Sequence, residues 1–250
     1  MLKKLNKYFT TYEKIWLSSI IILTIIFSIL FPEEDVNGIN GNIILLLYIL
    51  DSIFNVVCEL LISKQSKWNF IVSLLVEITE ILICIVCAYR FSTLLSTIFF
   101  WIPIDIISFI NWNKHKDKDD EELTVVRKLS KKKAILCILF VIVFTIIVGT
   151  LTSKVNITTT LFNSKNIDNL VDYIDACVTI LGIFNGLFIL FRLREQWIAW
   201  YIYSILELII NILSGQYILI ILKLAFLTNT TYGYIKWTKY IKDKKTEIIN

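Results

Sequence analysis

Residues 134–153 read AILCILFVIVFTIIVGTLTS, a run of apolar residues that contains no charge. Such a run is long enough to cross a hydrocarbon core of about 30 Å as a helix. A second run, Ile15 to Pro32, has the same character. It exceeds the apolar part of a signal peptide, and Phe31-Pro32-Glu33-Glu34 offers no small-residue cleavage site, so we expect it in the mature protein. The two runs predict a membrane protein built from spanning helices.

The composition favours the same class. Of the 250 residues, 56% are hydrophobic and 18% are charged, and the mean hydropathy is +0.71. Soluble domains average about 45–50% and about 25%, so the apolar excess is too large for a soluble core. Eight spanning helices are predicted from the apolar segments, at 15–32, 43–62, 69–88, 91–110, 134–152, 172–191, 197–213 and 217–235.

The placement of Lys and Arg predicts the orientation of these helices. With eight spans, most of the 25 basic residues fall on one side, including those of the connection 111–133 and those after residue 235. Basic residues in short loops are retained on the cytoplasmic side. The acidic turn Glu33-Glu34-Asp35 falls on the other side. We therefore expect both termini in the cytoplasm.

The cysteines and the single histidine give little support for an enzyme or a metal site. Cys84 and Cys87 form a CxxC pair, but no second pair and no histidine lie near it in the sequence. We expect the five cysteines to be small buried hydrophobes. His115 lies in a charged connection, and the sequence has no Gly-rich phosphate loop. We therefore expect no enzymatic activity, no metal, no cofactor and no nucleic-acid partner.

Two parts of the chain resemble each other. Leu61-Ile-Ser-Lys-Gln-Ser-Lys-Trp68 aligns with Leu190-Phe-Arg-Leu-Arg-Glu-Gln-Trp197, and Phe109-Ile-Asn-Trp112 aligns with Tyr234-Ile-Lys-Trp237. The shared residues are aromatic and basic rather than Leu and Ile, which favours a true repeat. Each copy holds three spans that begin outside and finish inside, so one helix must connect the copies. The predicted all-α organisation is 3+1+3 helices plus one N-terminal helix: residues 1–36 (cytoplasmic tail and extra helix), 37–113 (first repeat), 114–155 (charged loop and linker helix), 156–238 (second repeat) and 239–250 (basic tail).

Polar residues inside the spans predict a binding site near the middle of the membrane. Trp200, Ser204 and Glu207 share one helical face by their spacing, and so do Glu77 and Glu80. Charges at membrane depth are costly and face a partner or a cavity. Paired carboxylates favour a cationic guest, to which aromatic faces add cation–π contacts. The candidate substrate-binding residues are Trp197, Trp200, Glu77, Glu80, Asn185, Ser204, Glu207, Asn229, Asp175 and Tyr217.

Several of these residues have a plainer explanation. Glu207 can pair with Lys223, and Asp175 lies near the end of a span, where it can cap a helix. Anchoring at the membrane interface is favoured for three tryptophans near span ends, Trp68, Trp112 and Trp237. A membrane protein that transports nothing, such as an immunity or assembly factor, has no reason to bury matched polar faces in both repeats.

An ordered series of motifs resembles the PnuC-type vitamin transporter family. The motifs are Tyr173-Ile-Asp-Ala176, Arg192-x-Arg-Glu-Gln-Trp-Ile-Ala-Trp200 and Gly233-Tyr-Ile-Lys-Trp237, and the likeness extends loosely over residues 40–240. The resemblance implies a SWEET-like 3+1+3 fold in the bacterial inner membrane, often as a homotrimer. Family members carry nicotinamide riboside, thiamine, riboflavin or deoxynucleosides, which are then trapped by phosphorylation in the cytoplasm. Ser204 replaces a frequent Asn or Asp, and Glu77 and Glu80 stand where an amide is expected.

We therefore expect facilitated uptake of a small polar solute, with nicotinamide riboside as the leading candidate. Its pyridinium ring suits an acidic, aromatic site. The thiazolium of thiamine suits the same site, so thiamine is the first alternative. Riboflavin, which suits the site less well, and a deoxynucleoside are the others. We expect Trp197 and Trp200 to stack on the ring of the solute, while the two repeats rock around the site in alternating access.

Overall fold

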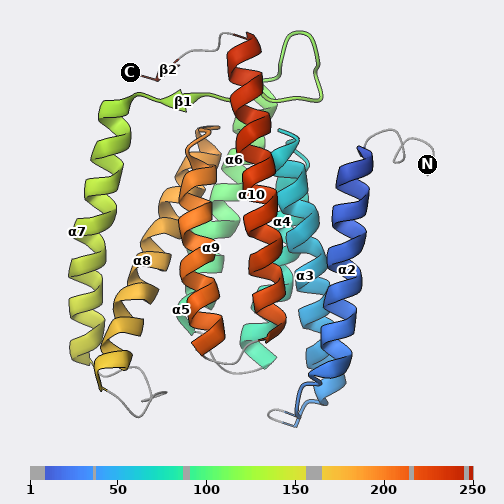
Figure 1. Ribbon diagram of the computed structural model, residues 1–250, viewed down its shortest axis with the longest axis vertical. Helices are drawn as coiled ribbons and strands as arrows, with labels where there is room; N and C mark the ends of the chain where they lie inside the picture. Colours follow the sequence, from blue (N-terminus) through green and yellow to red (C-terminus); the bar gives the residue numbers. More distant parts are fainter. Residues whose placement is uncertain are drawn as a thin grey trace.

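The computed structural model describes residues 9–35, 38–86, 91–155, 165–213, 217–244 and 248–249 (Figure 1). Within these residues nearly all regular structure is helical, and two short strands, β1 Lys128–Leu129 and β2 Ile248–Ile249, pair in parallel. The helices are α2 Thr11–Leu30, α3 Gly41–Ser63, α4 Asn69–Val86, α5 Phe91–Ser96, η1 Thr97–Trp101, α6 Ile102–Lys114, α7 Lys131–Val155, α8 Lys165–Leu190, α9 Gln196–Leu213 and α10 Tyr217–Lys244.

Local sequence explains where helices begin and where they change. α2 begins at a capping box: Thr10 Oγ1 accepts from Glu13 N at 3.2 Å, and Glu13 Oε2 accepts from Thr10 N at 2.8 Å. The π-helical turn η1 directly precedes Pro103. Proline has no N–H and clashes with the turn before it, and the Ile102 N–H donates to Thr97 O, five residues back. α5, η1 and α6 therefore follow one another as a single helical rod with a widened turn.

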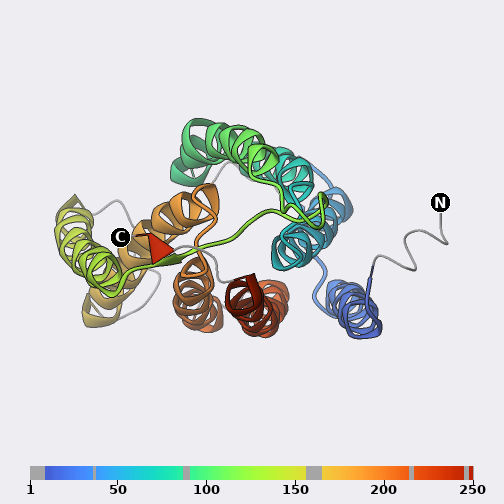
Figure 2. The same ribbon diagram turned by 90° about the horizontal axis from the view of Figure 1, so that it is seen from above.

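The contacts between helices close a ring, which Figure 2 shows end-on. Around the ring, α3 packs on α4, α4 on α6, α6 on α8, α8 on α9, α9 on α10, and α10 on α3. Two helices lie outside it: α7 packs on α8, and α2 packs on α3 and α10. The ring therefore sets the first half of the chain, α3 to α6, opposite the second half, α8 to α10.

The outer surface suits a lipid bilayer. Among the described residues, six helices are long and apolar enough to cross one, and α9 adds a shorter apolar stretch, Gln196–Ile212. Large apolar side chains lie exposed on the outside, such as Ile138 of α7, which is 59% exposed. An exposed apolar surface of this extent is stable only against lipid or another protein. The predicted class, an all-helical membrane protein, agrees with this architecture.

Helix boundaries differ from the apolar runs where polar residues continue a helix. α10 extends to Lys244, beyond the predicted end at residue 235, and α8 begins at Lys165 rather than at residue 172. The rod predicted at 91–110 continues to Lys114. Hydropathy marks only the part of a helix that suits lipid, so these extensions carry no apolar signal.

The α3–α4 and α8–α9 turns have the same backbone geometry. Gln65 and Arg192 both adopt the left-handed region, with φ of 58° and 60°. Gln65 N donates to Ile62 O and Arg192 N donates to Ile189 O, both at 2.9 Å. The two turns therefore give a register in which the chain after Gln65 can be compared with the chain after Arg192.

This register differs from the alignment made from the sequence. Counted from Gln65 and Arg192, Trp197 corresponds to Phe70 and not to Trp68. The sequence alignment paired Trp68 with Trp197, whereas the register of the two turns differs from that alignment by two residues. In this register, Ser73, Glu77, Glu80 and Cys84 correspond in order to Trp200, Ser204, Glu207 and Asn211.

The connection between α6 and α7 crosses one end of the ring and reaches both turns (Figures 1 and 2). Thr124 N donates to Gln65 O at 3.1 Å, and Arg127 N donates to Arg192 O at 2.9 Å. We call residues 123–129 the crossing segment. Its backbone therefore bridges the two halves of the ring at the end where both turns lie.

Candidate functional site

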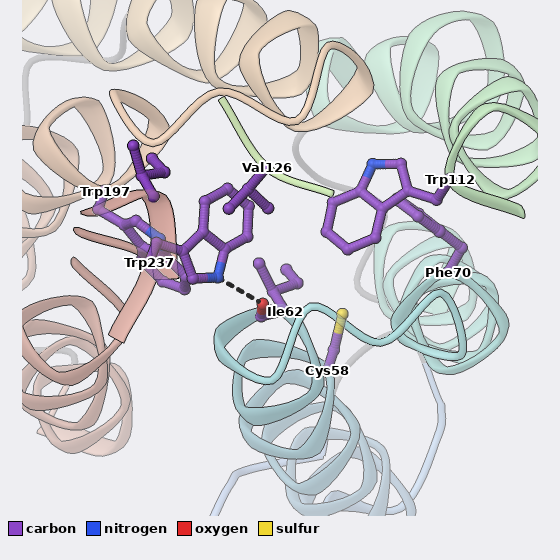
Figure 3. Packing of buried hydrophobic residues seen from close by; sticks show 8 residues of the cluster. Cys58, Ile62, Phe70, Trp112, Val126, Trp197 and Trp237 are labelled. Carbon is purple, nitrogen blue, oxygen red and sulfur yellow. Dashed lines mark hydrogen bonds between the residues drawn. The ribbon is translucent and has the colours of Figure 1, made fainter. Parts of the chain in front are cut away.

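Three tryptophans form a buried cluster beside the crossing segment (Figure 3). Trp197 packs edge-to-face on Trp237, with ring centroids 5.5 Å apart, and Phe70 packs edge-to-face on Trp112 at 5.0 Å. These geometries are favoured by the quadrupoles of the rings. Val126 of the crossing segment is fully buried in the same cluster. The cluster therefore fills this end of the ring with side chains from both halves.

Indole N–H groups of this cluster join the halves. Trp112 Nε1 donates to Ile189 O at 2.8 Å, and Trp237 Nε1 donates to Ile62 O at 3.2 Å. Each carbonyl belongs to the half opposite the tryptophan that it binds. The prediction that Trp112 and Trp237 anchor the chain at the membrane interface is wrong, because helix packing buries both completely. Trp68, by contrast, is 57% exposed.

Trp197 is covered by its neighbours. A Cβ added to Gly233 would lie 2.5 Å from Trp197 Cζ2, so the backbone of α10 passes directly over the indole. Trp237 covers another part of the Trp197 indole, and Trp197 is 1% exposed. Stacking of Trp197 on a solute, as the sequence predicts, therefore requires the cluster to open.

Trp200 lies one turn further along α9 and has different neighbours. Its ring stacks on Tyr203 at 4.6 Å and on Phe226 at 5.8 Å between centroids. Lys223 Nζ lies 5.1 Å from the Tyr203 centroid and 3.3 Å from Glu207 Oε2. The pairing of Glu207 with Lys223, one of the two explanations that the sequence left open, is therefore present. Trp200 is half-buried and lies on α9 between Trp197, which belongs to the aromatic cluster, and Glu207, which forms this ion pair.

Glu59 of α3 is a buried acid that the sequence argument did not select. It is 5% exposed, and Asn229 Nδ2 of α10 donates to its backbone oxygen at 3.0 Å and to its Oε2 at 3.4 Å. Asn229 was predicted as a site residue and is also buried. The available signal was a charge inside an apolar run, and its position near the predicted end of the span obscured it.

Acidic side chains of α4 and α6 lie together. The carboxyl groups of Glu77 and Asp105 are close enough to influence each other, and Ser73 lies beside them. Glu80 Oε2 accepts from Thr97 Oγ1, in η1, at 2.6 Å. Glu77 and Asp105 are 4% and 5% exposed. Of the two acids predicted on this face, Glu77 therefore has its carboxyl toward α6, and Glu80 has its carboxyl toward the π-helical turn η1.

Twelve buried side-chain oxygens have no hydrogen-bond partner among the described residues, and four of them belong to acids and to predicted site residues on the ring helices. These four are Glu77 Oε2, Asp105 Oδ2, Asn185 Oδ1 and Ser204 Oγ. They come from α4, α6, α8 and α9, so both halves of the ring contribute. Buried polar atoms in proteins are nearly always paired, so these groups need water or a bound solute. Carboxylates accept hydrogen bonds without donating, and they attract cations.

The remaining predicted residues lie elsewhere. Asp175 is exposed on α8. Its neighbour Tyr173 packs on α7, with its hydroxyl 3.0 Å from Thr150 Oγ1. The side chain of Tyr217, the first residue of α10, lies outside the described residues. Glu77, Glu80, Asn185, Ser204, Glu207, Asn229 and Trp200 thus lie on helices of the ring, and Asp175 lies exposed on α8.

Comparisons with known proteins agree with this architecture. The model of the family described as nicotinamide mononucleotide transporter matches residues 45–239. The nicotinamide riboside transporter PnuC of Haemophilus influenzae is 25% identical over 232 residues, which cover 92% of this chain and 91% of that protein. PnuC of Neisseria mucosa is 18% identical over 245 residues, which cover 93% of this chain and 83% of that protein.

A solved structure has the same fold. The crystal structure of the vitamin B3 transporter PnuC superposes with a TM-score of 0.70, covers 94% of both chains and shares 17% of residues. The all-helical membrane fold is therefore confirmed. Since the family model spans most of the chain, from within α3 to within α10, this chain belongs to the nicotinamide mononucleotide transporter family, the PnuC-type membrane transporters.

Proposed function

We propose that this chain carries nicotinamide riboside by facilitated transport across the inner membrane of a bacterium. Two relatives bear the name nicotinamide riboside transporter. We count eight spans: the six long apolar helices, together with α9 and α10. An even number of spans places both termini and the basic connections on the same side of the membrane. That side is the cytoplasm by the retention of Lys and Arg there.

The 3+1+3 arrangement is part of the proposal. In the first half α3 packs on α4 and α4 on α6, and in the second half α8 packs on α9 and α9 on α10. The first helix of each half meets the last helix of the other, as α3 meets α10 and α8 meets α6. Matching turns at Gln65 and Arg192 support the same relation. α7 then serves as the linker helix, and α2 is the extra N-terminal helix.

The proposed substrate site is formed by Glu77, Asp105, Asn185 and Ser204, and the buried oxygens of these residues that have no hydrogen-bond partner carry the proposal. Glu77 and Asp105 supply carboxyl groups from one half, and Asn185 and Ser204 supply neutral acceptors from the other. A pyridinium ring is a cation, and a ribose offers hydroxyl donors, so this set suits both parts of nicotinamide riboside. Trp200, which is half-buried and lies between Trp197 and Ser204 along α9, is the residue proposed to contact the pyridinium ring.

Lys223 sets a limit to the acidity of this site. Its ion pair with Glu207 leaves Glu207 engaged, and its ammonium lies over the ring of Tyr203. We therefore assign the attraction of the cationic ring to Glu77 and Asp105, with Glu80 held by Thr97 beside them. Asn229 acts through Glu59, because its amide is already bonded to that residue.

Uptake into proteoliposomes tests the proposal. The purified chain should admit labelled nicotinamide riboside in a saturable way, and Glu77→Gln should weaken its binding by about tenfold, the loss of one charge-assisted contact of about 1.4 kcal/mol. Glu122→Gln is the matched control, because Glu122 is an exposed acid of the α6–α7 connection. If folded protein neither binds nor admits nicotinamide riboside, the proposal fails.

Thiamine is the second candidate, because its thiazolium is also a ring cation. Competition between the two solutes in the same vesicles separates them: the true substrate saturates uptake at lower concentration. A homotrimer is proposed on the family resemblance, and native mass spectrometry of the detergent-solubilised chain measures the subunit number. A single chain per complex would refute that assignment without affecting the transport proposal.

A further inference from the structure

Arg192 occupies an unusual position at the α8–α9 turn. Its φ of 60° lies in the left-handed region, which arginine rarely adopts. Two backbone hydrogen bonds hold it there: Arg192 N donates to Ile189 O, and Arg192 O accepts from Arg127 N, both at 2.9 Å. The turn and the crossing segment thus fix the direction of this side chain at the basic end of the ring.

The guanidinium of Arg192 is buried without a partner for two of its nitrogens. Arg192 is 3% exposed, and neither Nε nor Nη1 has a hydrogen-bond partner among the described residues. Burial, and after it the positive charge of Arg127, together lower the pKa of Arg192 to about 10. Both influences oppose the charged form, and no acid among the described residues counters them. A buried unpaired charge is strongly destabilising.

The nearest acid of this turn is already engaged. Glu195 Oε1 accepts from Arg194 Nη2 at 3.0 Å, and Glu195 Oε2 accepts from Leu129 N at 2.9 Å. The amide of Gln196, which is 2% exposed, also has no partner among the described residues. The turn therefore holds uncompensated positive charge and unused amide donors in one short stretch of chain.

Phosphate is the anion that fits this arrangement best. A guanidinium presents parallel N–H groups that match two oxygens of a phosphate, and two neighbouring arginines suit its double charge better than the single charge of a carboxylate. We propose that Arg192, with Arg127 of the crossing segment beside it, binds a phosphate group at the basic end of the ring. The phosphate belongs either to a soluble phosphate compound or to the headgroup of an anionic lipid. This site is separate from the oxygens assigned to the transported solute.

Thermal unfolding in a phosphate-free sugar detergent tests the assignment. Inorganic phosphate is titrated against chloride at constant ionic strength, without any nicotinamide compound. A ligand that binds only the folded state raises Tm saturably, and we expect this for the wild-type chain. Arg192→Gln should bind at least tenfold more weakly. Lys132→Gln, which removes an exposed charge from the start of α7, should bind as the wild type does.

A second titration distinguishes the two sources of phosphate. Mixed micelles with phosphatidic acid replace inorganic phosphate; a response to the lipid alone assigns a headgroup, and a response to inorganic phosphate alone assigns a soluble compound. Arg127→Gln, which changes a half-buried residue, repeats the test if Arg192→Gln does not fold. The proposal is overturned if neither phosphate source raises Tm, or if the arginine variants respond as Lys132→Gln does. Because no nicotinamide riboside is present, failure here is distinct from failure of the transport assay.

Discussion

Replacement of Gly233 by alanine should destabilise the chain, because α10 passes over the indole of Trp197. The new Cβ would lie 2.5 Å from Cζ2, 2.6 Å from Cη2 and 2.7 Å from Cε2 of a rigid ring. Overpacking typically costs about 1–3 kcal/mol, and three close atoms place this case near the upper value. Alanine recovers about 1 kcal/mol of helix propensity over glycine. The net loss is about 2 kcal/mol, which lowers Tm by about 4–8 °C for a chain of this size.

Gly182→Ala is the matched control for this experiment. Gly182 also faces a tryptophan, but the added Cβ would lie 3.7 Å from Trp101 Cζ2, an ordinary contact. We expect Tm to stay or to rise by about 2–4 °C from the gain in helix propensity. Scanning fluorimetry of both variants in one detergent measures the difference. If Gly233→Ala unfolds at the same temperature as Gly182→Ala, Trp197 is not held against α10, and the packing argument is wrong.

Substitutions at three further contacts test the packing and the ion pairs. Lys223→Met should lower Tm more than the double change Lys223→Met with Glu207→Gln. The single change leaves the Glu207 carboxylate unpaired, at a cost of up to about 3 kcal/mol. Additive effects of the two changes in a double-mutant cycle would mean that the ion pair contributes nothing to stability. The Tyr240 hydroxyl donates to Asp117 and, with the other hydrogen bonds there, lowers the pKa of Asp117 to about 2. The ionised Asp117 therefore stabilises the fold above a pH of about 4, the pKa of an unfolded Asp. This stabilisation is lost as the pH falls toward about 2. Tyr240→Phe should raise that pKa and Asp117→Asn should flatten the fall of Tm over this window; equal slopes in all three chains would contradict the contact. Trp237→Phe removes the donor to a backbone carbonyl and should lower Tm by about 2–4 °C, for a bond of about 1 kcal/mol, and an unchanged Tm would show that the bond is not made in solution.

The apolar runs predicted the class and the order of the helices because a bilayer imposes a simple requirement on length and polarity. They could not predict that α10 continues to Lys244, since beyond the bilayer a helix needs no apolar residues. The widened turn η1 was also beyond the sequence argument. Pro103 signals a disturbed helix, but whether the chain answers with a kink, a break or a π turn depends on packing around Thr97 and Trp101.

Some contacts of the candidate residues follow from the sequence, and others do not. The sequence identified acids at membrane depth and the alternative partner of Glu207, because both follow from the cost of a charge in lipid. It misassigned Trp112 and Trp237, since a tryptophan near a helix end looks the same whether it faces lipid or the opposite half of the ring. It also missed Glu59, whose importance follows from its contact with Asn229, 170 positions away in the chain. Such contacts are set by the closing of the ring and have no local signal.

The crossing segment has a mechanical consequence for a protein whose halves are expected to move. Any motion that separates the Gln65 and Arg192 turns must stretch the backbone bonds from Thr124 and Arg127. With net values of about 1 kcal/mol each, breaking both would disfavour the parted form by a factor of about 30. The crossing segment therefore favours the arrangement in which the two turns stay together. Shortening or loosening it should change how often this end opens, independently of how tightly the solute binds.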